Sequence, residues 1–174
     1  MNIGINTVSK TKNRAVTNNL VQENHPFTSS ITESTNVLLK GEVNFTEQHN
    51  NWTLKVKGSW GKTWLSITIA SRKTDLKSHF LACQLKQTSF LSFLTRSSAF
   101  NFYGEKSKYS ELLLKEHETR SLLASKKSSV VLDANTLIFK GSVRKKDTTS
   151  LSNIFILIES LQNKIDNLDR VPSV

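Results

Sequence analysis

Large apolar and polar residues alternate along residues 51–70, which read NWTLKVKGSWGKTWLSITIA. Every second residue from Trp52 to Val56 is apolar, and after two glycines the same alternation runs from Leu65 to Ile69. A period of two, rich in β-branched and aromatic residues and interrupted by glycines, is typical of a half-buried β-hairpin. We therefore expect the rest of the fold to be organised around this hairpin.

Neighbouring segments extend the hairpin into a sheet. Residues 36–45 carry apolar side chains on one face, and Gly41 among them indicates a bulge or a close approach of the backbone. Three consecutive strands with short connections predict an antiparallel meander, and residues 79–85 predict a fourth strand. Residues 88–102 are rich in phenylalanine and fit either a short helix or a strand.

A second hairpin is predicted further along the chain. Residues 129–132 and 136–143 are its strands, and residues 133–135 supply the turn, where Asn135 tolerates a positive φ.

Two segments have helical periodicity. Residues 109–127 carry leucines and oppositely charged pairs at helical spacings. Residues 150–168 carry a wide apolar stripe that steps by three and four, with Asp147, Thr148 or Ser150 as a cap and Pro172 beyond the end. Such a stripe usually packs on a sheet, and the alternative is a contact between two copies of the chain.

The predicted fold class is α+β. An antiparallel β-meander and the later hairpin form a sheet that two helices cover on one face. Residues 1–35 are dominated by Asn, Thr and Ser and predict a disordered basic arm, because so few apolar side chains cannot offset the entropy of ordering. Residues 36–170 form the single predicted domain. The expected location is the cytoplasm, with an organelle stroma or matrix as the alternative.

Charge is the main indication of a partner. The chain has 24 Lys and Arg against 14 Asp and Glu, a net charge of +10, which favours an acidic protein, a nucleic acid or an anionic membrane surface. No run of apolar residues approaches the length of a membrane-spanning helix. A homo-oligomer through residues 150–168 is the other expected assembly.

Catalytic and metal-binding patterns are missing from the sequence. The four histidines and the lone Cys83 share no metal-ligand spacing, and no nucleophile or phosphate-loop motif is present. We therefore expect no enzyme activity, no cofactor and no metal. Cys83 lies in an apolar run and is interpreted as a buried structural residue.

The binding candidates are basic residues and nearby tryptophans. Cations interleaved with exposed aromatic rings suit a single-stranded nucleic acid, and the basic triplet at 144–146 suits anionic lipid. The candidate contact residues are Lys55, Lys57, Trp60, Trp64, Arg72, Lys73, Arg144, Lys145 and Lys146. The sequence therefore predicts a non-catalytic interaction or assembly module that docks on a protein complex or membrane surface, with a basic RNA- or single-stranded-DNA-binding protein as the alternative.

Overall fold

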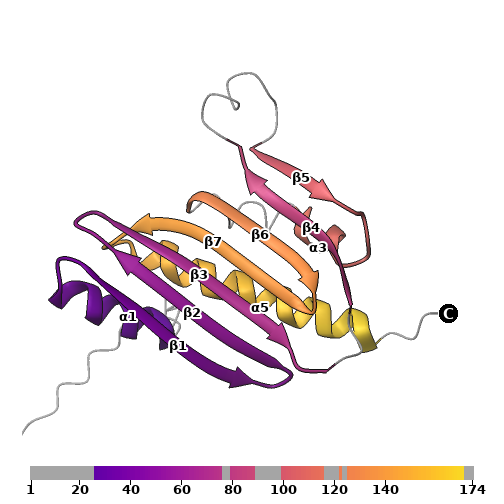
Figure 1. Ribbon diagram of the computed structural model, residues 1–174, viewed down its shortest axis with the longest axis horizontal. Coiled ribbons are helices and arrows are strands. Elements are labelled where there is room, and N and C mark those ends of the chain that lie inside the picture. The colour runs from indigo at the N-terminus through magenta and orange to yellow at the C-terminus, as the bar shows by residue number, and fades with distance from the viewer. Residues whose placement is uncertain (1–25, 76–78, 89–98, 116–121, 123–124, 171–174) are drawn as a thin grey trace, which may run out of the picture.

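The computed structural model describes residues 26–75, 79–88, 99–115, 122 and 125–170 (Figure 1). They form a seven-stranded antiparallel sheet with helices on one side, which confirms the predicted α+β class. The strands are β1 Gly41–His49, β2 Trp52–Trp60, β3 Trp64–Lys73, β4 Phe80–Gln87, β5 Phe100–Gly104, β6 Lys126–Ala134 and β7 Thr136–Arg144. The helices are α1 Pro26–Val37, α3 Ser110–Leu113 and α5 Thr148–Arg170.

The strand order is β1-β2-β3-β7-β6-β4-β5. The predicted central hairpin is β2–β3, and with β1 it forms the expected meander. The meander ends at β3, because the β6–β7 hairpin lies between β3 and β4. The predicted fourth strand therefore pairs with β6 and β5 instead of continuing the meander, which corrects the expected order.

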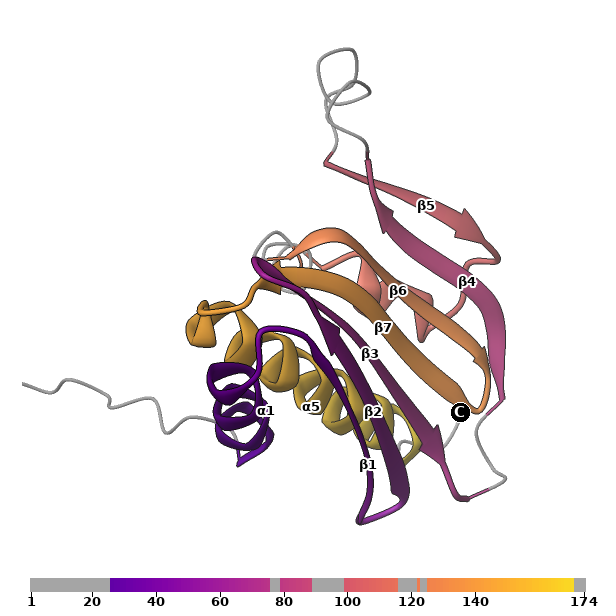
Figure 2. The same ribbon diagram turned by 60° about the vertical axis from the view of Figure 1, so that its left-hand side comes forward.

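Helix α5 lies across one face of the sheet, so that the domain has two layers (Figure 2). Its apolar stripe is buried, as predicted, and a stripe of this width against a sheet forms the core of a small α+β domain. Asp147 caps the helix, since its carboxylate accepts hydrogen bonds from the backbone N–H and the hydroxyl of Ser150 at 2.9 and 2.8 Å. The sheet of the same chain therefore occupies the stripe, which is the packing that the sequence favoured.

The prediction for residues 109–127 is wrong at its C-terminal end. Helix α3 has only four residues, and Lys126 and Lys127 belong to β6. The basic pair, which we interpreted as a helix end, instead begins a strand at a bulge where Lys127 has a φ of 53°. Residues 116–121 and 123–124 lie outside the described part of the chain.

Helix α1 corrects the extent of the predicted arm, since residues 26–35 are helical. Ile31 is fully buried, and the Phe27 ring stacks on Phe45 of β1 with 4.7 Å between the ring centroids. These two side chains anchor an otherwise polar helix to the sheet. The anchoring depends on residues distant in the chain, so the composition of residues 26–37 does not predict it. Residues 1–25, the rest of the predicted arm, lie outside the described residues.

Strand β1 begins later than predicted. Residues 38–40 connect α1 to the strand, and Leu38 and Leu39 are exposed. The close approach predicted at Gly41 is confirmed, because a Cβ at this position would lie 2.5 Å from an atom of the Trp60 ring.

Two details in the second half of the sheet also differ from the predictions. The register of β4 shifts between Phe80 and Cys83, so Cys83 is buried while Leu81 faces solvent. In the β6–β7 turn the positive φ belongs to Ala134, at 50°, and not to Asn135. Of the ambiguous residues 88–102, the last three belong to β5, and 89–98 lie outside the described residues.

Candidate functional site

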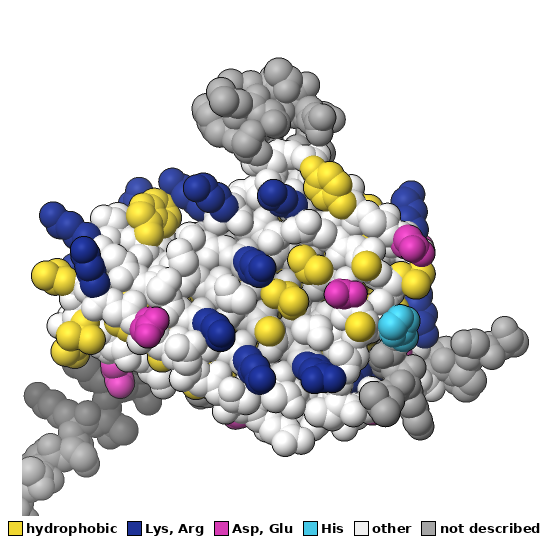
Figure 3. Space-filling view, viewed as in Figure 1, with side chains coloured by type: hydrophobic (Ala, Val, Ile, Leu, Met, Phe, Trp, Pro, Cys, Tyr) yellow, Lys and Arg dark blue, Asp and Glu magenta, His cyan; other side chains and the backbone are white. Residues whose placement is uncertain are grey.

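One face of the sheet carries the helices, and no described residue covers the other (Figure 3). We call the uncovered side the open face. Figure 3 shows Lys and Arg side chains spread across it and fewer Asp and Glu side chains. The strand registers define which residues share this face, because residues that pair directly across antiparallel strands point to the same side.

An apolar row crosses the middle of the open face. The register places Ala70 of β3 beside Ile138 of β7, and Ile138 beside Val131 of β6. All three side chains are partly exposed. Lys55 of β2 borders the row on one side, and on the other side Gln84 of β4 separates Val131 from Tyr103 of β5, which is 52% exposed. Adjacent apolar groups on three strands form a continuous patch in the centre of the open face.

A row of lysines runs beside the apolar row. Lys57 of β2, Lys140 of β7 and Lys86 of β4 lie in one line across the sheet, with Thr68 and Ser129 on the strands between them. All three lysines are exposed. Since neighbouring strands are about 4.8 Å apart, lysines on alternate strands are spaced by about 9.6 Å.

The remaining charges keep this face basic. Arg72, Arg144 and Lys126 are exposed and share the same side, and the acidic residues in the described registers of this side are Glu42 and Asp133. Glu42 lies on the edge strand and Asp133 at a strand end. A partner over the central rows would therefore meet mainly cations.

The predicted tryptophan contacts are not available as expected. Trp60 is 6% exposed and faces the helix side of the sheet, where its indole N–H donates a 3.1 Å hydrogen bond to the carbonyl of Leu38. Trp64 does lie on the open face, but the Lys126 ammonium lies 4.5 Å from its ring centroid. Trp60 therefore does not provide the exposed aromatic ring that we predicted, and the partly exposed Trp64 has a lysine beside its ring.

Lys73 was a candidate contact residue, but its side chain is only 1% exposed. It points to the helix side, where its ammonium donates a hydrogen bond to Asp169 and forms a 2.9 Å ion pair with Asp166. The same carboxylates accept hydrogen bonds from the hydroxyl of Tyr109 at 2.5 Å and the indole of Trp52 at 3.1 Å. This cluster joins the end of β3 to the last turns of α5.

The electrostatics of the cluster favour a charged lysine. Burial acts to lower the pKa of Lys73, but hydrogen bonds and attraction from Asp169 and Asp166 outweigh it, and the pKa is raised above its ordinary value. Lys73 is therefore an ammonium ion at neutral pH and has a structural role. Burial likewise raises the pKa of the Cys83 thiol, which keeps it protonated.

The predicted basic triplet does not form one patch. Arg144 ends β7 on the open face, whereas the Lys145 ammonium donates a 2.6 Å hydrogen bond to the carbonyl of Leu38. Lys146 is exposed in the turn before α5. Lys55 and Lys57 are exposed on the open face as the sequence reasoning required.

Within the described residues, no group of three or more His, Cys, Asp and Glu side chains could hold a metal ion. The helices described here include none that is both long and apolar enough to cross a membrane. Comparison with protein-family models, with curated proteins and with solved structures gives no match.

Sequence reasoning missed several residues of the open face, namely Lys86, Lys126, Val131, Ile138, Lys140 and Tyr103. Most of these residues alternate with buried residues along their own strand, and this pattern assigns them to the side of the strand that faces away from the core. Their adjacency depends on the order β3-β7-β6-β4, which brings together strands far apart in the chain.

Proposed function

We propose that the protein is a non-catalytic interaction module that docks an acidic protein partner on the open face of its sheet. The observation that carries this proposal is the apolar row Ala70–Ile138–Val131 lying beside the lysine row Lys57–Lys140–Lys86 on a face that no described residue covers.

The arrangement resembles the anatomy of a protein–protein interface, in which an apolar centre is surrounded by a polar rim. The cations around the centre attract an acidic partner and fix its orientation. Thr68 adds a partly exposed hydroxyl group between Lys57 and Lys140, where it can hydrogen bond to a carboxylate.

The distance between successive lysines of the lysine row fits an amphipathic α-helix laid across the strands. Seven residues of an α-helix rise about 10.5 Å, which is close to the roughly 9.6 Å between lysines on alternate strands. A helix with one acidic residue per heptad beside its apolar stripe would place a carboxylate at each of Lys57, Lys140 and Lys86. The partner we propose therefore presents an acidic amphipathic helix.

The alternative function, single-stranded nucleic-acid binding, loses its main structural support. Stacking of bases requires exposed aromatic faces, but Trp60 is buried and the Trp64 ring has Lys126 over it. Tyr103 lies at the β5 edge, away from these two residues.

The test is a titration of the full chain with a fluorescent acidic amphipathic helical peptide, followed by anisotropy. The peptide repeats Leu at heptad apolar positions and Glu beside them. A second peptide has Gln for Glu, and a third ligand is single-stranded RNA of matched length. We expect the acidic peptide to bind at least tenfold more tightly than either of the others at physiological salt.

Two matched variants assign the binding surface. K57E/K86E/K140E removes the lysine row, and K62E/K106E/K146E makes the same change of net charge at exposed lysines outside the strands. The first variant should lose at least tenfold in affinity for the acidic peptide and the second should lose much less. Equal losses, or tighter binding of RNA than of the acidic peptide, would overturn the proposal.

A further inference from the structure

A small cavity lies on the helix side of the sheet, away from the open face. It has a volume of about 60 Å³ between the edge hairpin and the two long helices. Its walls come from α1, β1, β2 and α5, and they comprise Phe27, Glu47, His49, Trp52, Leu54, Phe155, Ile158, Glu159 and Gln162. One water molecule needs about 10–15 Å³ of such a volume. The cavity therefore has room for a group of roughly four to six non-hydrogen atoms.

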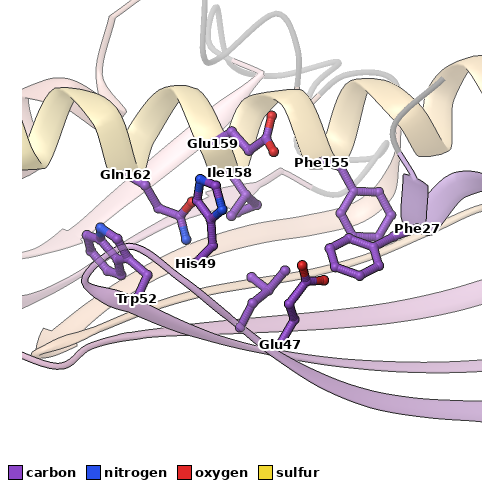
Figure 4. Close-up of a pocket in the computed structure, with 9 residues that line it drawn as sticks. Phe27, Glu47, His49, Trp52, Phe155, Ile158, Glu159 and Gln162 are labelled. Carbon is purple, nitrogen blue, oxygen red and sulfur yellow. The ribbon is translucent and has the colours of Figure 1, made fainter. Parts of the chain in front are cut away.

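Aromatic side chains stand at both ends of the cavity. Trp52 stands at one end and the Phe27–Phe155 pair at the other (Figure 4). Those two phenyl rings are 5.4 Å apart between centroids. The Trp52 indole is fixed by its hydrogen bond to Asp166 and by stacking on Phe80 at 6.5 Å. The Lys73 ammonium already lies 5.7 Å from the Trp52 ring centroid, so the attraction of the cavity's aromatic rings for a further cation comes from Phe27 and Phe155. Leu54 and Ile158 complete an apolar floor.

The mouth of the cavity is acidic, in contrast to the chain as a whole. Glu47 comes from β1 and Glu159 from α5, on opposite sides of the mouth, and both are exposed (Figure 4). No lysine or arginine belongs to the described lining. In a protein of net charge +10, two carboxylates above an aromatic cavity produce a local preference for a cation.

We propose that this cavity binds a compact organic cation, namely an ammonium group carrying small alkyl substituents. Aromatic faces attract such cations, and alkyl groups on the nitrogen contact the apolar floor. Glu47 and Glu159 provide the opposite charge. The cation belongs to a free small amine or to a methylated lysine side chain of another protein, since both present the same chemical group.

The test is calorimetric titration of the full chain with choline chloride and with its neutral isostere 3,3-dimethylbutan-1-ol, using sodium chloride as the salt control. We expect choline to bind at least tenfold more tightly than the alcohol. Nα-acetyl-trimethyllysine amide then distinguishes the two sources. If it binds at least as tightly as choline, the ligand is a protein side chain, and if it binds more weakly, the ligand is a free amine.

Substitutions at the mouth assign the binding to this cavity. E47Q/E159Q should weaken choline binding at least fivefold. The control E42Q changes a glutamate of the same strand that points to the open face, and it should leave binding unchanged. Equal binding of choline and the alcohol, no detectable binding of choline, or an unaffected E47Q/E159Q variant would overturn the proposal. Loss of acidic-peptide binding in these variants is not expected, since the two sites lie on opposite faces of the sheet.

Discussion

Replacing Lys73 with methionine tests the buried cluster that joins β3 to α5. Methionine keeps most of the side-chain volume but removes the cation between Asp166 and Asp169. Three carboxylates, those of Asp75, Asp166 and Asp169, then lack a compensating charge, while Asp166 and Asp169 retain their hydrogen bonds from Trp52 and Tyr109. The expected effect is therefore a large loss of folding stability with little change of shape.

The magnitude follows from the burial of the partners. Removing one member of a fully buried ion pair costs about 3–5 kcal/mol. The side chains of Asp166 and Asp169 are 19% and 17% exposed, and water reaching them reduces the penalty to the lower end, about 3 kcal/mol. With a denaturant slope of about 2 kcal/mol/M in urea, the unfolding midpoint should fall by about 1.5 M.

The assay is urea unfolding followed by circular dichroism, with two control variants. K57M makes the same charge change at an exposed site of the open face and should leave the midpoint nearly unchanged. K73M/D75N/D166N/D169N replaces Lys73 and its three carboxylate partners with neutral side chains and should recover much of the lost stability. A K73M midpoint within about 0.2 M of wild type, equivalent to about 0.4 kcal/mol at the slope above, would refute the assigned role of the cluster.

Three further predictions concern stability. Because the folded-state pKa of Lys73 lies above its ordinary value of 10.5, the stability difference between wild type and K73M should be constant from pH 7 to about 10 and shrink at higher pH, measured by urea unfolding at each pH. D147A removes the cap of α5 and should cost about 1 kcal/mol in the same assay, whereas a cost near zero would contradict capping. G41A should destabilise the fold by about 1–3 kcal/mol, because it forces a Cβ against the Trp60 ring. The control G61A should cost less, because a Cβ at that position meets no atom within 4 Å. Equal melting temperatures of the two variants would contradict the close approach at Gly41.

Local periodicity predicted the elements that depend on a short stretch of chain. The β2–β3 and β6–β7 hairpins and α5 each have a strong internal pattern, and each forms where it was expected. The pattern at 109–127 failed because leucines and ion pairs at helical spacings also occur where a short helix precedes a strand. Helix α1 was missed because its stability comes from burial of Ile31 and Phe27 against distant residues.

The candidate site was only partly predictable for a related reason. Alternation places Lys55 and Lys57 on the polar side of their strand, but it does not determine which side of the sheet the helices cover. Lys73 also lies in an alternating strand, but on the side that α5 covers, so its charge is paired within the protein. The lysine row exists only through the non-consecutive order of the strands, which no local pattern encodes.

The central claim is that the open face, and not the helix side, docks the acidic partner. The most direct measurement is a methyl NMR titration of the isoleucine-labelled full chain with the acidic amphipathic peptide. Ile138 reports on the middle of the open face, and the half-buried Ile156 reports on α5. The account predicts saturable shifts of the Ile138 methyl signal with Ile156 unchanged. Shifts of Ile156 with Ile138 unchanged, or no shift of either, would contradict it.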